Sequence, residues 1–137
     1  MVKTIFISGH LDISIKEWEI HYLPKIKEYV EQKCFFVIGD ARGCDQMSMN
    51  YLWDNKVENV IIYHMFEKPL NNPGYMTIGG FRNHSSKDSR MTLNSDIDLA
   101  WVRCENDSKL LYGDKYKPGR ISGTQQNLNR RKKKNKY

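Results

Sequence analysis

The segment FFVIGDARGCD, residues 35–45, decides the fold of this chain. It opens with four consecutive apolar residues, a pattern typical of a strand that is buried on both faces. Gly39 and Gly43 then frame a polar turn, and Asp45 belongs to the residue types that most often cap the start of a helix. A buried strand that passes through a glycine turn into a helix is the unit from which layered α/β proteins are built.

The same order of strand, polar turn and helix recurs on both sides of this segment. Strands are predicted at residues 3–8, 60–63 and 97–102, and helices at 14–30, from 45, at 83–93 and from 123 onward. Ser14 and Glu17 form a capping-box pattern, and Pro24 is expected to kink the first helix or split it in two. Residues 64–80 show neither the helical nor the strand spacing of apolar residues and are interpreted as a long surface loop. Residues 103–121 form a polar stretch.

Strands buried on both faces that alternate with helices indicate a parallel sheet covered on both sides. We therefore predict a Rossmann-like α/β fold, an open parallel sheet with helices on both faces, in a single domain. The length of 137 residues, with 39% hydrophobic and 28% charged residues, fits one globular domain. Six of the 22 basic residues lie at positions 130–136, and the other sixteen equal the acidic residues in number. We assign residues 1–129 to the domain and residues 130–137 to a basic C-terminal tail.

Several classes of protein and of site do not fit this sequence. The longest apolar runs are too short to cross a bilayer, and the chain starts directly in a strand without a hydrophobic leader. Three cysteines, odd in number and widely spaced, fit neither a disulfide framework nor a metal-ligand pattern. The four histidines lack the spacing of a helical metal site. We expect a cytoplasmic protein without membrane contact, metal or cofactor.

A ligand of such a sheet binds beyond the carboxyl ends of the strands, near the point where the strand order reverses. Gly9 follows the first strand, Gly39 and Gly43 follow the second, and Gly123 opens the last helix. Glycine lets backbone N–H groups approach a ligand closely, and a helix N-terminus adds partial positive charge. These glycine turns therefore predict an anion-binding site at the carboxyl ends of the strands, and phosphate is the anion that such a site most often binds. None of them matches the dinucleotide-binding fingerprint or the P-loop.

Four motifs occur in order along the chain: Gly39 to Asp45 after a buried strand, Lys87-Asp88 ahead of Met91, Ser95 to Trp101, and Ser122-Gly123-Thr124 with Asn127. Together they resemble the SLOG superfamily, a Rossmann-like group that includes the Lonely-Guy phosphoribohydrolases, the DNA-processing single-strand binders and many small phage and bacterial proteins. The resemblance extends from about residue 5 to residue 131. It implies a nucleotide or nucleotide-derived small molecule bound across the strand ends, and it implies a homodimer.

The resemblance leaves open whether this ligand is sensed or consumed. Lonely-Guy enzymes carry Pro-Gly-Gly-x-Gly-Thr-x-x-Glu and use its glutamate when they cleave the N-glycosidic bond between base and ribose phosphate. The corresponding residues 118–127 contain one extra residue, and Asn127 stands at the place of the glutamate. An amide can hydrogen-bond a ribose hydroxyl but cannot accept a proton as a carboxylate does. If the chain is such a hydrolase, Asp88 and Asp45 are the candidate catalytic acid and base.

The predicted ligand contacts lie on the turns after the strands, around residue 83 and at the start of the last helix. They are Gly9, His10, Gly39, Asp40, Arg42, Gly43, Asp45, Arg82, Asp88, Ser122, Gly123, Thr124 and Asn127. Arg42 and Arg82 have two interpretations, because a guanidinium can clamp phosphate oxygens or can be solvated or paired with a neighbouring aspartate. Asp45 is likewise either a helix cap or a ligand contact.

A second class of function, single-stranded nucleic-acid binding, also fits the sequence. The basic residues 130–137 would contact phosphates with strong salt dependence, and Tyr75 and Phe81 would stack on bases. The other interpretation of residues 130–137 is a solvated helix extension whose cations favour the negative end of the helix dipole.

Overall fold

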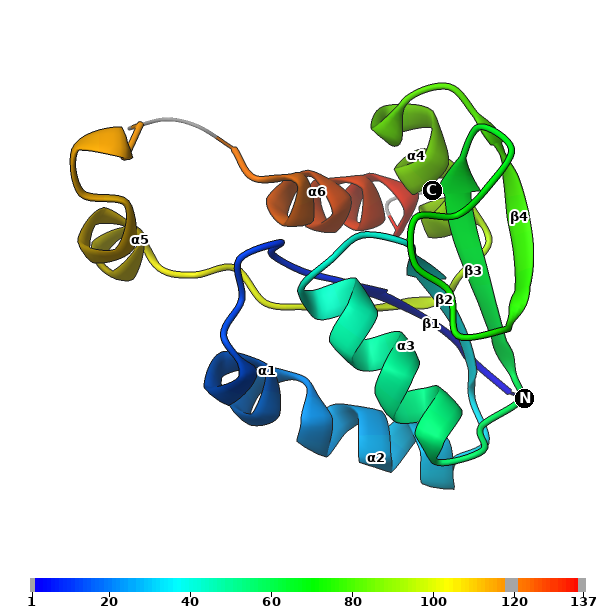
Figure 1. The fold of residues 1–137 in the computed structure, drawn as a ribbon. Coiled ribbons are helices and arrows are strands. Elements are labelled where there is room, and N and C mark those ends of the chain that lie inside the picture. The colour runs from blue at the N-terminus through cyan, green and yellow to red at the C-terminus, as the bar shows by residue number, and fades with distance from the viewer. Residues whose placement is uncertain (1, 118–120, 136–137) are drawn as a thin grey trace.

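The computed structural model describes residues 2–117 and 121–135, which form a five-stranded, all-parallel sheet with helices on both faces (Figure 1). The strands are β1 (Thr4–Ser8), β2 (Phe35–Gly39), β3 (Val60–Met65), β4 (Met76–Phe81) and β5 (Ile97–Ala100), in the spatial order β4-β3-β2-β1-β5. The helices are α1 (Ile15–His21), α2 (Leu23–Glu31), α3 (Cys44–Asp54), α4 (His84–Leu93), α5 (Glu105–Tyr112) and α6 (Gly123–Asn135), with a 3-10 turn η1 (Gly113–Lys115). The predicted Rossmann-like α/β fold is confirmed. Strand order reverses between β1 and β5, because β1 to β4 are added in one direction and β5 on the other side.

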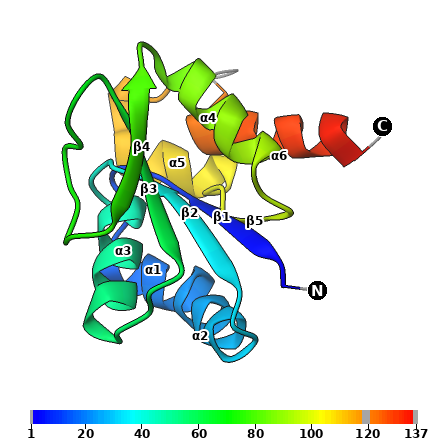
Figure 2. The same cartoon turned by 90° about the vertical axis from the view of Figure 1, so that its right-hand side faces the viewer.

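The helices form two layers around the sheet. Helices α1, α2 and α3 cover one face, and α4 and α6 cover the other, as the two views show (Figure 1, Figure 2). Successive strand side chains alternate between these layers, as the period of a strand requires. The residues packed toward α1, α2 and α3 include Ile5, Ile7, Phe36, Ile38 and Ile62, whereas Phe6, Val37 and Tyr63 pack with Met91 of α4. Both faces of the central strands are therefore core.

Local sequence signals set the path through α1 and α2. The side chain of Ser14 accepts a hydrogen bond from the backbone N–H of Glu17, and the Glu17 carboxylate accepts one from the N–H of Ser14. The predicted capping box is thus confirmed. Pro24 lies in the first turn of α2, where its missing N–H has no helical partner to lose. The predicted split of the first helix occurs between His21 and Leu23.

Two segments differ from the sequence prediction. Strand β4 lies inside the predicted loop 64–80 and pairs in parallel with β3 at the edge of the sheet. It lacks a buried apolar run, because Met76 and Ile78 are exposed and Gly79-Gly80 follow them. Helix α5 lies inside the predicted polar stretch and has no buried residue, so it shows no apolar core face that periodicity would detect.

The predicted boundary at residue 129 falls inside α6, which continues to Asn135. Arg131 is buried and its guanidinium donates to Asp98 at 2.9 Å and to the Ser95 carbonyl at 2.8 Å. The Lys134 ammonium donates to the carbonyls of Thr92 and Leu93 at the end of α4. The basic segment is therefore part of the domain as far as Asn135, and positions 136–137 lie outside the described residues.

No helix within residues 2–117 and 121–135 is long and apolar enough to cross a membrane.

Candidate functional site

Charged side chains from two sides of the sheet meet at the carboxyl end of β2. Asp40 follows β2, Asp45 comes from the first turn of α3, and Lys87 and Asp88 come from α4. The Lys87 ammonium lies 3.8 Å from Oδ1 of Asp40, and both side chains are about 95% buried, with 5% and 6% of their surface exposed. We call Asp40, Asp45, Lys87 and Asp88 the acid–lysine cluster. Lys87 supplies positive charge among these carboxyls, and Arg130 adds positive charge near Asp88. No trio of metal-ligand side chains in the described residues is arranged to hold an ion.

Burial controls the protonation of Asp45. Loss of hydration raises the pKa of this carboxyl to about 7, while Lys87 and the backbone N–H of Ala41 act in the opposite direction. The Ala41 N–H donates to Oδ2 of Asp45 at 3.3 Å. Asp45 can therefore release or take up a proton near neutral pH, which is the property a general acid or base requires. It is not the helix cap that the sequence also allowed, because Gly43 occupies that position.

Asp88 and Asn127 are brought together by the packing of α4 against α6. The Asn127 side chain lies beside the Asp88 carboxyl, and its Oδ1 accepts a hydrogen bond from Arg130 at 2.6 Å. Burial raises the pKa of Asp88, and Lys87 and Arg130 oppose that shift. A carboxyl from α4 thus stands beside the amide that replaces the expected glutamate, and the two predicted site residues share one location.

Glycine is needed at three predicted site positions by packing within the protein. A Cβ at Gly39 would lie 2.7 Å from Oδ2 of Asp45, so the glycine makes room for the acid–lysine cluster. Gly43 adopts a φ of +75°, and a Cβ there would contact the backbone oxygens of His10 and Leu11. A Cβ at Gly9 would contact Cys44 and Tyr22.

The first turn of α6 lies open. A Cβ on Gly123 would have no atom within 4 Å, so a ligand can approach the backbone there. The Ser122 hydroxyl accepts a hydrogen bond from the N–H of Gln125 at 3.1 Å, and Thr124 is buried. These predicted contacts therefore form a capped helix start with an accessible glycine.

The crevice at the strand-order reversal is occupied by an ion-pair network that the sequence prediction did not include. Arg103, directly beyond β5, is 3% exposed at its side chain and pairs with Asp12 at 3.2 Å and Glu17 at 3.0 Å. Its backbone N–H donates to Nε2 of His10 at 3.0 Å, and the Tyr112 hydroxyl donates to Asp12. His10, predicted as a ligand contact, is thus engaged by the protein itself. Its pKa is lowered by burial and by Arg103.

The two predicted arginine contacts lie outside the acid–lysine cluster. Arg42 is exposed in the turn after β2, and Arg82 is exposed just before Asn83, which caps α4. Lys87, by contrast, was missed as a site residue although it lies in a predicted motif. The available signal was its spacing of four residues from Met91, which places both on the inner face of α4.

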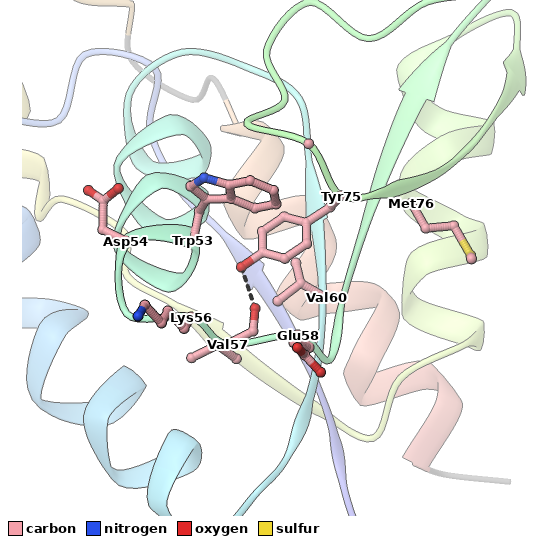
Figure 3. Close-up of a pocket in the computed structure, with 9 residues that line it drawn as sticks. Trp53, Asp54, Lys56, Val57, Glu58, Val60, Tyr75 and Met76 are labelled. Carbon is pink, nitrogen blue, oxygen red and sulfur yellow. Dashed lines mark hydrogen bonds between the residues drawn. The ribbon is translucent and has the colours of Figure 1, made fainter.

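A pocket of about 690 Å³ lies at the other end of the sheet, beside the first residues of β3 and β4 (Figure 3). Tyr75 lines it, donates its hydroxyl to the Val57 carbonyl at 2.6 Å and packs edge-on against Trp53. Tyr75 is 9% exposed, and Phe81 is packed against Tyr63. Tyr75 is therefore held within the protein and Phe81 is partly buried, and the stacking of these rings on bases stays a prediction.

Comparisons with protein-family models, with curated proteins and with solved structures found no match to this chain. The geometry defines a Rossmann-like α/β domain with a buried acid–lysine cluster at the carboxyl end of its sheet, next to an open helix start.

Proposed function

We propose that this chain binds a nucleotide or nucleotide-derived small molecule at the carboxyl ends of its parallel strands. The supporting observation is the acid–lysine cluster, where Lys87 is buried beside Asp40 and near Asp45 and Asp88. Burying charged groups costs free energy even when they are paired. Their convergence at the edge where parallel sheets bind ligands therefore favours a binding role over a structural one.

The two parts of this edge suit the two chemical parts of a nucleotide. The first turn of α6 presents backbone N–H groups and the positive end of the helix dipole, and Gly123 leaves that surface open. A phosphate is the group such a surface attracts. The acid–lysine cluster instead offers donors and acceptors of hydrogen bonds, which suit a sugar or a base. The resemblance of residues 39–45 and 122–127 to the SLOG superfamily supports the same ligand class.

If the ligand is consumed, we propose hydrolysis of its N-glycosidic bond, in which water adds to the anomeric carbon of the ribose phosphate and the base leaves with a proton. Asn127 cannot accept a proton, but Asp88 lies beside it and supplies a carboxyl at that location. Burial raises the pKa of Asp45 to about 7, so this carboxyl can exchange a proton near neutral pH. A sensor would leave the nucleotide intact, whereas a hydrolase would release the free base.

A thermal-shift screen of the whole chain against nucleoside mono-, di- and triphosphates and dinucleotides tests this proposal. A ligand at one hundred times its dissociation constant stabilises a protein by about 2.7 kcal/mol. For a domain of this size that corresponds to a rise in melting temperature of roughly 5–10 °C. The same samples, analysed by chromatography for released base, distinguish a sensor from a hydrolase.

A pair of variants locates the binding. Asp88→Asn changes the acid–lysine cluster, and Met76→Ala changes an exposed side chain at the pocket on the other end of the sheet. We expect the ligand affinity to fall in Asp88→Asn and to stay at the wild-type value in Met76→Ala. The reverse pattern, or a screen without any shift, contradicts the proposal.

Single-stranded nucleic acid is the second candidate ligand, favoured by the charge of one layer. Residues 82–98 and 121–135 contain eight Lys and Arg against three Asp and Glu, and Arg90, Lys132 and Lys133 are exposed. Deleting the chain from residue 130 would also remove the buried Arg131, so charge reversal is the cleaner test. Lys132→Glu with Lys133→Glu should weaken oligonucleotide binding and its salt dependence while leaving nucleotide binding unchanged.

A further inference from the structure

Strand β4 forms an edge of the sheet, and no helix of the described residues lies over its outer side in either view (Figure 1, Figure 2). β3 pairs with one side of β4, so every second residue of β4 directs its backbone N–H and C=O outward. Proteins usually protect such an edge with charged side chains, a proline or a bulge. Residues 69–81 contain no Lys, Arg, Asp or Glu, and the irregular pairing with β3 begins only after Ile78. The first half of β4 is therefore open to pairing with another strand.

The side chains of β4 add apolar surface to this open edge. Met76 is 75% exposed and Ile78 is 38% exposed, and their spacing of two residues places them on the same face of the sheet. Figure 3 shows the Met76 side chain pointing away from Tyr75 and the pocket. The next position at this spacing is Gly80, where a Cβ would have no atom within 4 Å. β4 thus carries two exposed apolar side chains and, two positions further on, open space that can receive one.

A second copy of β4 fits this edge by symmetry. A two-fold axis perpendicular to the sheet at Ile78 aligns two copies of the strand antiparallel and gives both copies the same contacts. Ile78 then faces Ile78 of the second copy, and Met76 faces Gly80 of the second copy, which leaves room for the longer side chain. Like charges directly opposite each other would disfavour the pairing of a strand with itself, and β4 carries no charged side chain.

The same arrangement brings opposite charges together at both ends of the paired strands. Arg82 follows β4, so it comes to the end of the strand pair where Gly74 precedes β4 in the second copy. Gly74 lines the pocket of Figure 3 together with two acidic residues, Asp54 and Glu58, and one basic residue, Lys56. Arg82, Asp54 and Glu58 are exposed, and none of them forms an ion pair within the described residues. The guanidinium of each copy therefore meets an acidic pocket on the other.

We infer that the partner of β4 is a second copy of this chain. The two β4 strands pair antiparallel and join two five-stranded sheets into one continuous sheet, with Arg82 of each copy in the pocket of the other. In that pocket the guanidinium lies between carboxylates and the ring of Trp53, which is 44% exposed. This interface does not depend on nucleotide binding, because it uses the outer edge of the sheet and the pocket at its amino end rather than the acid–lysine cluster.

Disulfide trapping tests the position of the two-fold axis. Cys104 is exposed and Cys34 and Cys44 are buried, so Cys104→Ser serves as the background. Ile78→Cys should then form a covalent dimer on mild oxidation, because residues directly opposite in antiparallel strands have Cβ atoms about 4.5–5.5 Å apart. Leu110→Cys, at a position of α5 that is 84% exposed, is the control and should stay monomeric. Equal crosslinking at both positions overturns the inference.

Sedimentation velocity at micromolar to submillimolar concentrations measures the dimer itself. We expect a monomer–dimer equilibrium for the wild type and a dissociation constant about tenfold higher for Arg82→Glu, because two exposed ion pairs are replaced by repulsion. Adding Glu58→Arg to Arg82→Glu should restore the wild-type constant, because the two charges are exchanged. Arg90→Glu makes the same change of charge at an exposed position of α4 and should leave the constant unchanged.

All of these substitutions are at exposed positions, so the variants should fold, and thermal melts check this. A wild-type protein that sediments as a monomer at every concentration overturns the inference. A dimer that fails to crosslink through Ile78→Cys, or that keeps its affinity in Arg82→Glu, does so as well. The nucleotide screen is a separate measurement, so failure of this interface leaves the proposed function standing.

Discussion

The guanidinium of Arg103 donates two hydrogen bonds to the carboxylate of Glu17, from Nε to Oε2 at 3.1 Å and from Nη2 to Oε1 at 3.0 Å. The same Oε1 accepts the N–H of Ser14 in the capping box of α1. One carboxylate therefore joins the start of α1 to the residue group beyond β5, 86 positions later in the chain. This pairing fills the position beyond the carboxyl ends of β1 and β5, where the strand order reverses.

Glu17→Gln should lower the free energy of unfolding at pH 7 by roughly 1–2 kcal/mol, because Arg103 is buried and loses its charged partner. Arg103 holds the pKa of Glu17 down to about 2 from an ordinary 4.5. The stability from this carboxylate is present above pH 4.5 and is lost as pH falls through 2, so the difference from wild type should shrink over that window. Urea unfolding at several pH values measures it. Glu19→Gln, at an exposed position of α1, is the control, and equal effects of the two substitutions contradict the prediction.

Asp45→Asn should make the protein more stable than wild type at pH 8 and about equal to it at pH 4. The folded pKa of Asp45 is about 7 against an ordinary 3.8, so the folded state binds more protons than the unfolded state between these values. The stability that Asp45 contributes therefore falls as pH rises through this window, by up to roughly 4 kcal/mol. An amide cannot ionise and should remove that slope. Asp54→Asn, at an exposed position, should retain it, and a parallel pH profile for wild type and Asp45→Asn contradicts the prediction.

Gly43→Ala should lower the stability of the protein, whereas Gly123→Ala should lower its affinity for a nucleotide. At Gly43 the positive φ and the nearby His10 and Leu11 oxygens make an added Cβ costly, by about 2 kcal/mol or more. At Gly123 the space is open, and alanine should change stability by no more than about 1 kcal/mol, in the favourable direction. Nucleotide affinity should nevertheless fall in Gly123→Ala, because the new methyl group covers the backbone that a phosphate approaches. Thermal melts and calorimetry give the two readouts, and a destabilised Gly123→Ala with unchanged affinity goes against this assignment.

Arg131→Met should destabilise the domain by roughly 3 kcal/mol, because it leaves the buried Asp98 carboxylate without its partner. Lys132→Met, one position later on the exposed side of α6, should change stability by less than about 0.5 kcal/mol. Denaturant unfolding compares the two variants directly. Equal stability of both would mean that residues 130–135 are a dispensable tail after all.

Elements with strong local signals were predictable from sequence. The capping box at Ser14, the helix break at Pro24 and the apolar run of β2 depend on residues close together in the chain, and the structure confirms all three. Strand β4 was not predictable, because an edge strand with exposed side chains forms through pairing with β3 rather than through an apolar pattern of its own. Helix α5 was not predictable either, because it has no buried residue and therefore no apolar face that its sequence would reveal.

The candidate site was likewise predictable only in part from the sequence. Glycine turns after strands and the polar residues Asp45, Asp88 and Asn127 were visible as types and spacings, so the sequence alone determined a layered parallel sheet with a polar carboxyl edge. Which of those residues touch one another was decided only by the packing of α3, α4 and α6 around that edge. Burial and charge depend on neighbours from distant parts of the chain. For that reason only the tertiary structure could place Lys87 among three aspartates.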